Sequence, residues 1–147
     1  MRIAVVGTGL IGGSIGLALT ALGHDVVAFD RDAASLARAV ALGAVGSTAP
    51  DVATAGAGAD VAFVAVPVGS IADAVVELLD AGVPVVTDVG SVKGPIVADV
   101  LERSPERAAR FVGGHPMAGS EQEGIDGARA ELFVGAAWVV MSTSATS

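Results

Sequence analysis

The sequence contains no cysteine, and its basic residues include a single lysine, Lys93. The absence of cysteine excludes disulfide frameworks, thiolate metal sites and thiol nucleophiles. The chain has 147 residues and a formal net charge of −8, so it offers no basic stripe to a nucleic acid. The same charge balance argues against binding to an anionic membrane surface. We therefore expect neither nucleic acid nor membrane as a partner.

Aromatic residues are also scarce, since they make up 3% of the chain and tyrosine is absent. Hydrophobic residues nevertheless reach 52% and charged residues only 16%, which excludes a disordered chain. The core must therefore be built from Val, Leu, Ile and Ala, as in buried parallel sheets. The length suits one domain with a buried core and is too short for two of ordinary size.

Formal charge is missing from residues 3–24, a run that resembles a signal peptide or a membrane span. Glycines interrupt this run repeatedly, and no small-residue cleavage site closes it. A better interpretation is a buried strand at residues 3–6, a glycine turn, and a helix with an apolar stripe. The stripe consists of Ile11, Ile15, Ala18, Leu19 and Leu22. We expect a cytoplasmic protein.

Strand-like and helix-like segments alternate along most of the chain. Strands are predicted at residues 3–6, 26–29, 44–45, 61–66, 83–87, 111–113 and 136–141. Residues 47–58 are rich in Gly, Ala and Thr, and no structure is assigned to them. The repeated order predicts an α/β fold with a doubly wound, mostly parallel sheet. Residues 1–141 then form one domain, and residues 142–147 form a linker or the artificial end of an expressed chain.

Helix boundaries are indicated by capping residues. Asp32 is placed to cap a second helix, which Gly43 ends. Ser70 and Asp73 have the spacing of a capping box at the start of a later helix. Pro95 suits the first turn of a helix that runs to residue 101. The helix after the capping box has an apolar stripe of Ile71, Val75, Leu78 and Leu79.

The turn at residues 7–12 reads Gly-Thr-Gly-Leu-Ile-Gly and fits the pattern G-x-G-x-x-G. It follows a predicted strand and opens a predicted helix, which is the context of a dinucleotide-binding turn. Gly7 permits the tight turn, Gly9 lets the backbone reach the pyrophosphate, and Gly12 allows close packing of helix on strand. The helix N-terminus offers free N–H groups to the phosphates. The predicted cofactor-binding residues here are Gly7, Thr8, Gly9, Leu10, Ile11 and Gly12.

Asp30 ends the next predicted strand and is placed to accept hydrogen bonds from the adenosine ribose. A 2′-phosphate at that position would face a carboxylate, so we expect NAD rather than NADP. Arg31 is the competing signal, because a nearby arginine can pair with a 2′-phosphate. The sequence therefore predicts a Rossmann NAD(P)-binding fold with NAD as its cofactor.

Two later segments follow predicted strands and therefore lie at the carboxyl ends of these strands, where doubly wound sheets bind ligands. The first, residues 87–94, contains Ser91, and the second, residues 113–121, contains His115. His115 can change its protonation state near neutral pH, and Ser91 is a hydroxyl on the neighbouring loop. A base and an orienting hydroxyl beside a nicotinamide are what oxidation of an alcohol requires. The alternative is that His115 is only a hydrogen-bonded loop residue.

Lys93 and Asp88 belong to the first of these segments and leave two interpretations open. Lys93 either pairs with Asp88 or offers positive charge to an anionic substrate. Asp88 either orients a partner or caps the loop. No grouping of His, Asp and Glu residues has convincing metal-ligand spacing, so no metal is expected.

At these residues the sequence resembles the prephenate dehydrogenase family. The resemblance lies in residues 7–16, 65–68, 90–94 and 113–121 and covers essentially the whole chain. The segment His-Pro-Met-Ala-Gly-Ser-Glu that begins at His115 is far more specific than the glycine turn. The resemblance implies NAD-dependent oxidative decarboxylation of prephenate to 4-hydroxyphenylpyruvate, on the route to tyrosine.

The resemblance also implies roles for individual residues. His115 resembles the residue that takes the hydrogen bond, and then the proton, from the ring 4-hydroxyl. Ser91 resembles the hydroxyl that orients His115 and the substrate near the nicotinamide. The substrate-binding residues implied are Ser91, His115, Ser120 and Glu121, and the cofactor site is completed by Val66, Pro67 and Ser91.

Members of that family continue into a C-terminal helical domain that forms a homodimer and contributes an arginine to the substrate carboxylates. That domain is absent from these residues, so we expect the chain to be the N-terminal part of a homodimeric enzyme and to be inactive alone. The alternatives are an arogenate dehydrogenase, a related β-hydroxy acid dehydrogenase, and a NAD-binding module without catalysis. The sequence does not separate prephenate from arogenate.

Overall fold

Strands and helices alternate along most of the chain in a computed structural model, which describes residues 1–119 and 124–142. The strands are β1 (Arg2–Val6), β2 (Asp25–Phe29), β3 (Ser47–Thr48), β4 (Val61–Val64), β5 (Val85–Asp88), β6 (Phe111–Pro116) and β7 (Trp138–Ser142). The helices are α1 (Leu10–Ala21), α2 (Ala33–Ala41), α3 (Val52–Gly56), α4 (Val68–Asp80) and α5 (Gly94–Arg103). Two short 3-10 helices, η1 (Ala108–Arg110) and η2 (Ile125–Gly127), complete the described elements.

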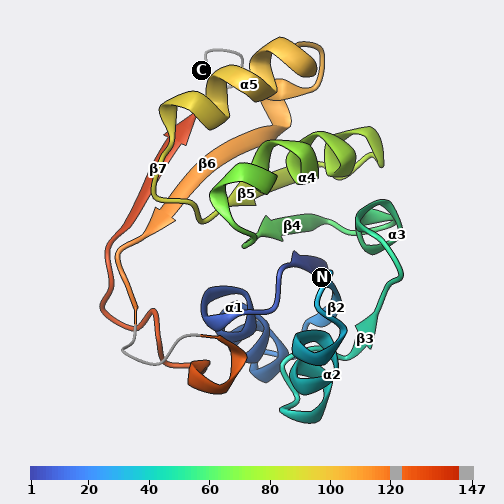
Figure 1. The fold of residues 1–147 in the computed structure, drawn as a ribbon, viewed down its shortest axis with the longest axis vertical. Coiled ribbons are helices and arrows are strands. Elements are labelled where there is room, and N and C mark those ends of the chain that lie inside the picture. Colours follow the sequence, from blue (N-terminus) through green and yellow to red (C-terminus); the bar gives the residue numbers. More distant parts are fainter. Residues whose placement is uncertain (120–123, 143–147) are drawn as a thin grey trace.

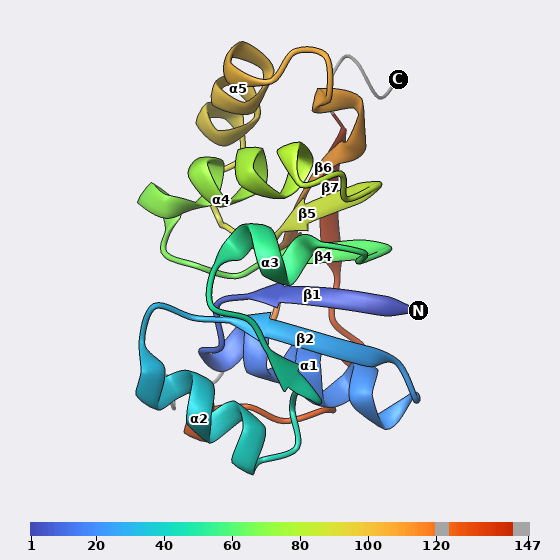
Figure 2. The same ribbon diagram turned by 90° about the vertical axis from the view of Figure 1, so that its right-hand side faces the viewer.

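The strands form one sheet in the order β3-β2-β1-β4-β5-β6-β7. Neighbouring strands are parallel, except that β7 runs antiparallel to β6 at the edge (Figure 1). The strand order reverses between β1 and β4, which places a topological switch point at the centre of the sheet (Figure 2). The predicted α/β fold with a doubly wound, mostly parallel sheet is confirmed.

Helices cover both faces of the sheet, and each face has its own apolar core. Successive residues of β1 point to opposite faces, so Ala4 and Val6 join one core while Val5 joins the other. The first core packs against α3, α4 and α5, and the second packs against α1 and α2. The predicted apolar stripe of α4 is fully buried in the first core. Stripe residue Leu22, beyond the end of α1, is by contrast 73% exposed, so that part of the prediction is wrong.

Two of the predicted helix signals are confirmed, and one is wrong. The side chain of Asp32 accepts hydrogen bonds from the first backbone N–H groups of α2, and Pro95 lies in the first turn of α5. The capping box at Ser70 and Asp73 does not form, because α4 begins earlier and Pro67 is its N-cap residue. The backbone N–H of Ser70 already bonds to the Pro67 carbonyl, so Ser70 lies within the first turn.

The third strand is also predicted in the wrong place. Ala44 and Val45 are buried without forming a strand, because they pack in the connection beside α1. The strand that forms, Ser47–Thr48, is exposed at the sheet edge and carries no apolar signal. The unassigned segment contains α3, whose N-cap residue Asp51 accepts a hydrogen bond of 2.7 Å from the Thr54 N–H. That bond holds the pKa of Asp51 below its ordinary value.

Part of one sheet face is apolar and open to solvent in the described residues. Val85 of β5 and Val140 of β7 are 43% and 63% exposed. The pairing of Phe63 with Thr87 puts Val85 on the same face as Phe63. Phe63 also lines a groove of about 140 Å³ between the sheet and α1, together with Ile15, Ala18, Leu19, Phe133 and Trp138. This open face, defined by Val85 and Val140, lies beside that groove, at the edge of the sheet area covered by α1.

No helix among the described residues is both long enough and apolar enough to cross a membrane.

Candidate active site

A cleft lies at the switch point, where the carboxyl ends of β1, β2 and β4 meet. Its volume is about 490 Å³, within the usual range for small-molecule sites. Of the predicted cofactor-binding residues, Gly7, Gly9, Asp30, Arg31, Val66 and Pro67 line it. The other predicted cofactor-binding residues, Thr8, Leu10, Ile11, Gly12 and Ser91, are not among its lining residues.

The three glycines of the turn differ in what surrounds them. Gly7 has a φ of +96°, and a Cβ there would lie 2.3 Å from the Ala65 carbonyl oxygen. A Cβ on Gly12 would lie 1.8 Å from the Gly7 carbonyl oxygen. A Cβ on Gly9 would meet nothing within 4 Å, so the turn leaves open space at the start of α1. Gly7 and Gly12 therefore serve the close packing of the turn, and Gly9 faces the cleft.

The start of α1 is prepared for an anion. Gly9 is its N-cap residue, and no side chain caps the helix. The first N–H groups of a helix have no partner within the helix, and they carry the positive end of its dipole. A phosphate bound in the adjoining cleft would supply the missing acceptors.

Asp30 joins the turn to the end of β2. Its Oδ2 accepts hydrogen bonds from the Thr8 N–H at 2.7 Å and from the Thr8 hydroxyl at 2.9 Å, and its Oδ1 accepts from the Asp32 N–H at 2.8 Å. Thr8 is fully buried, so both of its donors serve the turn. Asp30 itself is half-buried and lines the cleft, and its carboxylate has acceptor capacity beyond these three bonds.

The rim of the cleft is acidic. Asp32, Asp73 and Glu77 line it together with Asp30, and Arg31 is the only basic residue among the described residues that line it. Sequence reasoning missed Glu77, which lies within α4, and Val52, which lies in the helix that was not assigned. Phe29 was also missed, although it directly precedes Asp30 and its position at the strand end would have indicated it.

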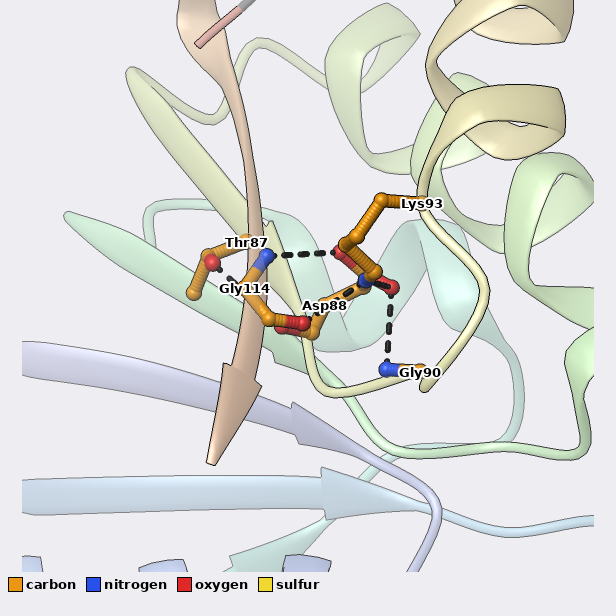
Figure 3. Close-up of polar contacts among 5 residues, drawn as sticks. All are labelled: Thr87, Asp88, Gly90, Lys93 and Gly114. Atoms are coloured by element: carbon orange, nitrogen blue, oxygen red, sulfur yellow. Dashed lines mark hydrogen bonds and ion pairs between the residues drawn. The ribbon is translucent and has the colours of Figure 1, made fainter. Parts of the chain in front are cut away.

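A second polar centre lies where β5 and β6 end, and the buried carboxylate of Asp88 forms its middle (Figure 3). Asp88 Oδ2 accepts from the Gly90 N–H at 3.0 Å and forms an ion pair with Lys93 Nζ. Asp88 Oδ1 accepts from the Gly114 N–H at 3.0 Å. Lys93 Nζ also donates to the Gly114 carbonyl oxygen at 2.7 Å. Of the two interpretations of Lys93, the pair with Asp88 is the one that forms.

The two predicted catalytic residues lie directly beside this centre. Ser91 follows Gly90 on the loop after β5, where its side chain is exposed. His115 follows Gly114 and is half-buried. Because β6 extends to Pro116 instead of ending at residue 113, His115 is a strand residue opposite Val139 of β7. The predicted substrate residues Ser120 and Glu121 lie outside the described residues.

Gly114 has no room for a side chain. A Cβ there would lie 2.7 Å from the Asp88 carbonyl oxygen and 2.8 Å from Trp138 Nε1. The glycine before His115 therefore lets β5, β6 and the Trp138 ring approach one another closely. Among the described residues, no group of three or more acidic or histidine side chains is placed to hold a metal ion.

Comparisons with known proteins point to one family. A family model of the prephenate dehydrogenase nucleotide-binding domain matches residues 15–147. The chain is 34% identical to a prephenate dehydrogenase of Bacillus subtilis over 143 residues, which cover 94% of the chain and 38% of that protein. It is 35% identical to a cyclohexadienyl dehydrogenase of Zymomonas mobilis over 90% of the chain and 46% of that protein. The chain thus spans less than half the length of these relatives.

Solved structures are similar over the whole chain. The arogenate dehydrogenase of Synechocystis superposes with a TM-score of 0.87 at 35% identity, covering 100% of this chain and 52% of that one. The prephenate dehydrogenase of Aquifex aeolicus, solved with hydroxyphenyl propionate and NAD+, superposes with a TM-score of 0.88 at 29% identity and the same coverage. A 3-hydroxyisobutyrate dehydrogenase of Mycobacterium tuberculosis, at 23% identity, shares the fold alone.

Gly12→Ala and Gly9→Ala should separate the two tasks of the turn. The Cβ added at position 12 would overlap the Gly7 carbonyl, so we expect Gly12→Ala to lower the free energy of unfolding by about 1–3 kcal/mol. Gly9→Ala should leave it within about 0.5 kcal/mol, because the new methyl group meets open space. Gly9→Ala should instead weaken dinucleotide binding by occupying the cleft. Urea unfolding and calorimetric titration measure the two effects, and equal stability of the two variants would contradict this assignment.

Proposed function

Because the chain belongs to the prephenate dehydrogenase family, as its nucleotide-binding domain, we propose that it carries the NAD site and the proton acceptor for oxidative decarboxylation of prephenate. The observation that carries this proposal is the placement of His115. It lies at the carboxyl end of β6, and the carboxyl ends of the parallel strands also form the edge of the sheet that carries the cleft. The preceding residue, Gly114, is held in place by hydrogen bonds to its backbone N–H and C=O groups. The product of the proposed reaction is 4-hydroxyphenylpyruvate.

The residues of the cleft fit NAD. The open space at Gly9 and the uncapped start of α1 suit a pyrophosphate. Asp30, at the end of β2, suits the ribose hydroxyls, and its negative charge opposes a 2′-phosphate. The apolar residues Val66 and Pro67 form the wall beside β4. When bound, NAD supplies the hydride acceptor of the reaction.

The chain's own residues handle the proton. His115 accepts the hydrogen bond of the ring 4-hydroxyl and takes its proton as the hydride leaves the same carbon. The ring carboxylate departs as CO₂, and its bonding electron pair makes the ring aromatic and turns the oxygen at ring position 4 into a phenolate. That oxygen takes the proton back from His115, which gives the 4-hydroxyl of the product. Since aromatisation supplies much of the driving force, the protein mainly aligns and polarises the substrate. Ser91, on the neighbouring loop, orients His115 and the substrate.

Arogenate is a second candidate substrate for the same site. The observation that favours it is the likeness to the Synechocystis arogenate dehydrogenase, whose TM-score of 0.87 is close to the 0.88 of the Aquifex aeolicus prephenate dehydrogenase and whose identity of 35% exceeds the 29% of that protein. The two substrates differ in a keto or amino group on the side chain and share the ring at which His115 acts. Turnover with each substrate, measured in parallel, distinguishes them.

Asp30→Asn tests the cofactor preference. The substitution removes the charge that opposes a 2′-phosphate, so we expect the ratio of NADP to NAD dissociation constants to fall by about tenfold. Both affinities should also decrease, because Asn cannot accept all the bonds of the carboxylate with Thr8 and Asp32. Calorimetric titration with both dinucleotides gives the ratio. Arg31→Ala is the matched control and should weaken NADP binding alone, whereas an unchanged ratio in Asp30→Asn would assign the preference elsewhere.

His115→Asn tests the proton acceptor. In a fusion of this chain to the part of the Bacillus subtilis relative that it does not cover, we expect kcat to fall by about 10²–10⁴. NAD affinity should be nearly unchanged, because Asn can keep a hydrogen bond but cannot take the proton. Ser91→Ala should be milder, since it removes orientation only. His24→Asn, at the other histidine of the chain, is the control, and near-normal kcat in His115→Asn would place the base elsewhere.

The open face supports a second part of this proposal, a further helical domain beyond residues 1–141 that covers it and forms the homodimer. The chain covers 38% of the Bacillus subtilis relative, so most of that relative has no counterpart here. The chain has a net charge of −8. In the described part of the site, the cationic side chains that could face a dianionic substrate are Arg31 and the buried Lys93. An arginine from the further domain would supply a further cationic partner.

The isolated chain should therefore bind NAD but fail to turn over prephenate. In this proposal the further domain supplies part of the substrate pocket, and positioning accounts for much of an enzyme's rate. We also expect self-association through the open face. NADH absorbance with saturating NAD and prephenate measures turnover, and calorimetry on the same sample establishes that the NAD site is formed. Rapid turnover by the 147 residues would show that the site is self-contained.

A further inference from the structure

We propose that the Asp88–Lys93 ion pair is the positioning element of this site. It sets the relative placement of Ser91 and His115 by holding the residue that precedes each of them. This inference rests on the proposed function, because it takes these two side chains to be the reacting pair. It adds two residues, Asp88 and Lys93, that act on the chemistry only through the backbone.

One carboxylate serves both catalytic segments. Asp88 accepts the N–H of Gly90, which precedes Ser91, and the N–H of Gly114, which precedes His115, each at 3.0 Å. The two bonds go to different oxygens of the same rigid group (Figure 3). The loop after β5 and the end of β6 are thereby tied to a common point. A displacement of Asp88 moves both segments together.

Lys93 completes the restraint on the His115 side. Its Nζ donates to the Gly114 carbonyl oxygen at 2.7 Å. That oxygen belongs to the peptide group that carries the His115 nitrogen, so the ammonium fixes the plane from which His115 projects. With the N–H of Gly114 on Asp88 and its C=O on Lys93, both backbone polar groups of this glycine are held by one ion pair.

The backbone ladder alone does not provide this restraint. The register of β5 and β6 pairs Val86 with Phe111 and Thr87 with Val112, and it goes no further toward His115. Beyond Val112, β6 is held on one side by antiparallel pairing with β7 and on the other by the Asp88 and Lys93 side chains. At Gly114, directly before His115, the ion pair therefore replaces the backbone hydrogen bonds that would otherwise join β6 to β5.

Because the pair is buried, its contribution to the free energy of unfolding is expected to be small. The side chain of Asp88 is 0% exposed and that of Lys93 is 8% exposed, so both charges lose most of their hydration on folding. Replacement of a buried ion pair by neutral groups of similar shape is often neutral or stabilising. Charge-assisted hydrogen bonds are, however, shorter and stronger than neutral ones, so they hold their partners in place more firmly. The pair therefore suits the fixing of geometry better than the strengthening of the fold, and the two effects can be separated.

The test is the double variant Asp88→Asn/Lys93→Met, which keeps the shape of both side chains and removes both charges. We expect its unfolding midpoint to fall modestly, because an amide at position 88 accepts only one of the two N–H groups and the Gly114 carbonyl loses its donor. Amide hydrogen exchange at Gly90 and Gly114 should accelerate by about tenfold or more, as for loss of a hydrogen bond to a charged group. The imidazole ¹⁵N signals of His115 should shift and broaden, while those of His24, the other histidine, should not change.

The matched control is Asp80→Asn/Arg107→Met, which neutralises an exposed pair that joins α4 to the segment before β6. It should leave the exchange rates and the His115 signals unchanged. The positioning proposal is overturned if Asp88→Asn/Lys93→Met leaves them unchanged too. It is also overturned if the variant merely lowers the unfolding midpoint and accelerates exchange equally throughout β5 and β6, because that is the signature of a structural role.

A kinetic arm uses the fusion protein. There, Asp88→Asn/Lys93→Met should lower kcat with little change in the KM for NAD, and it should cost nothing further in the His115→Asn background. An equal loss in both backgrounds would contradict positioning through His115. The NMR arm needs no turnover, so failure of the proposed reaction would leave it readable, and the two hypotheses are tested separately.

Discussion

The buried carboxylate of Asp88 is the constraint that fixes how β5, the loop after it, the start of α5 and β6 are arranged. A charge without water must be matched by donors, and the chain brings three to it from a loop, a helix start and a neighbouring strand. The helix start supplies Lys93, the one lysine of the sequence. Satisfying this carboxylate requires that β5, the loop after it and β6 adopt one relative arrangement. That same arrangement places a histidine and a serine at the end of the sheet.

Local patterns determine the centre of this fold and fail at its margin. Buried apolar runs identify β1, β2 and β4 because these strands contact cores on both faces, whereas β5 contributes Val86 to the first core only. The edge strand Ser47–Thr48 contacts neither core and has no such pattern, while Ala44 and Val45 have the pattern because a turn buries them. The spacing of Ser70 and Asp73 fits a cap, but the preceding Pro67 already starts α4. Apolar character reports burial, and burial coincides with a strand only inside the sheet.

The location of the site could be predicted from the sequence, but only some of its contacts could. Glycine spacing and strand order locate the cleft, since carboxyl ends of parallel strands meet at one edge. The sharing of Asp30 with Thr8 joins residues 22 positions apart, and no local pattern records it. The bond between Lys93 and Gly114 spans 21 positions and depends on how β6 lies beside β5. Sequence spacing names the groups, and tertiary structure decides which donor meets which acceptor.

The central pairing of β1 with β4 has a consequence for how the chain reaches its fold. The Arg2 N–H bonds to the Asp60 carboxylate, 58 positions away, and Ile3 pairs with Val61. Closing so long a loop costs entropy before the contacts it permits are gained, and such non-local pairing slows folding. The nucleotide turn leaves the ribosome before β4 does, yet Gly7 lies against the Ala65 carbonyl and reaches its final packing only after β4 has been made. During synthesis, the part of the cleft formed by the nucleotide turn is therefore completed only when the segment after β4 has been made.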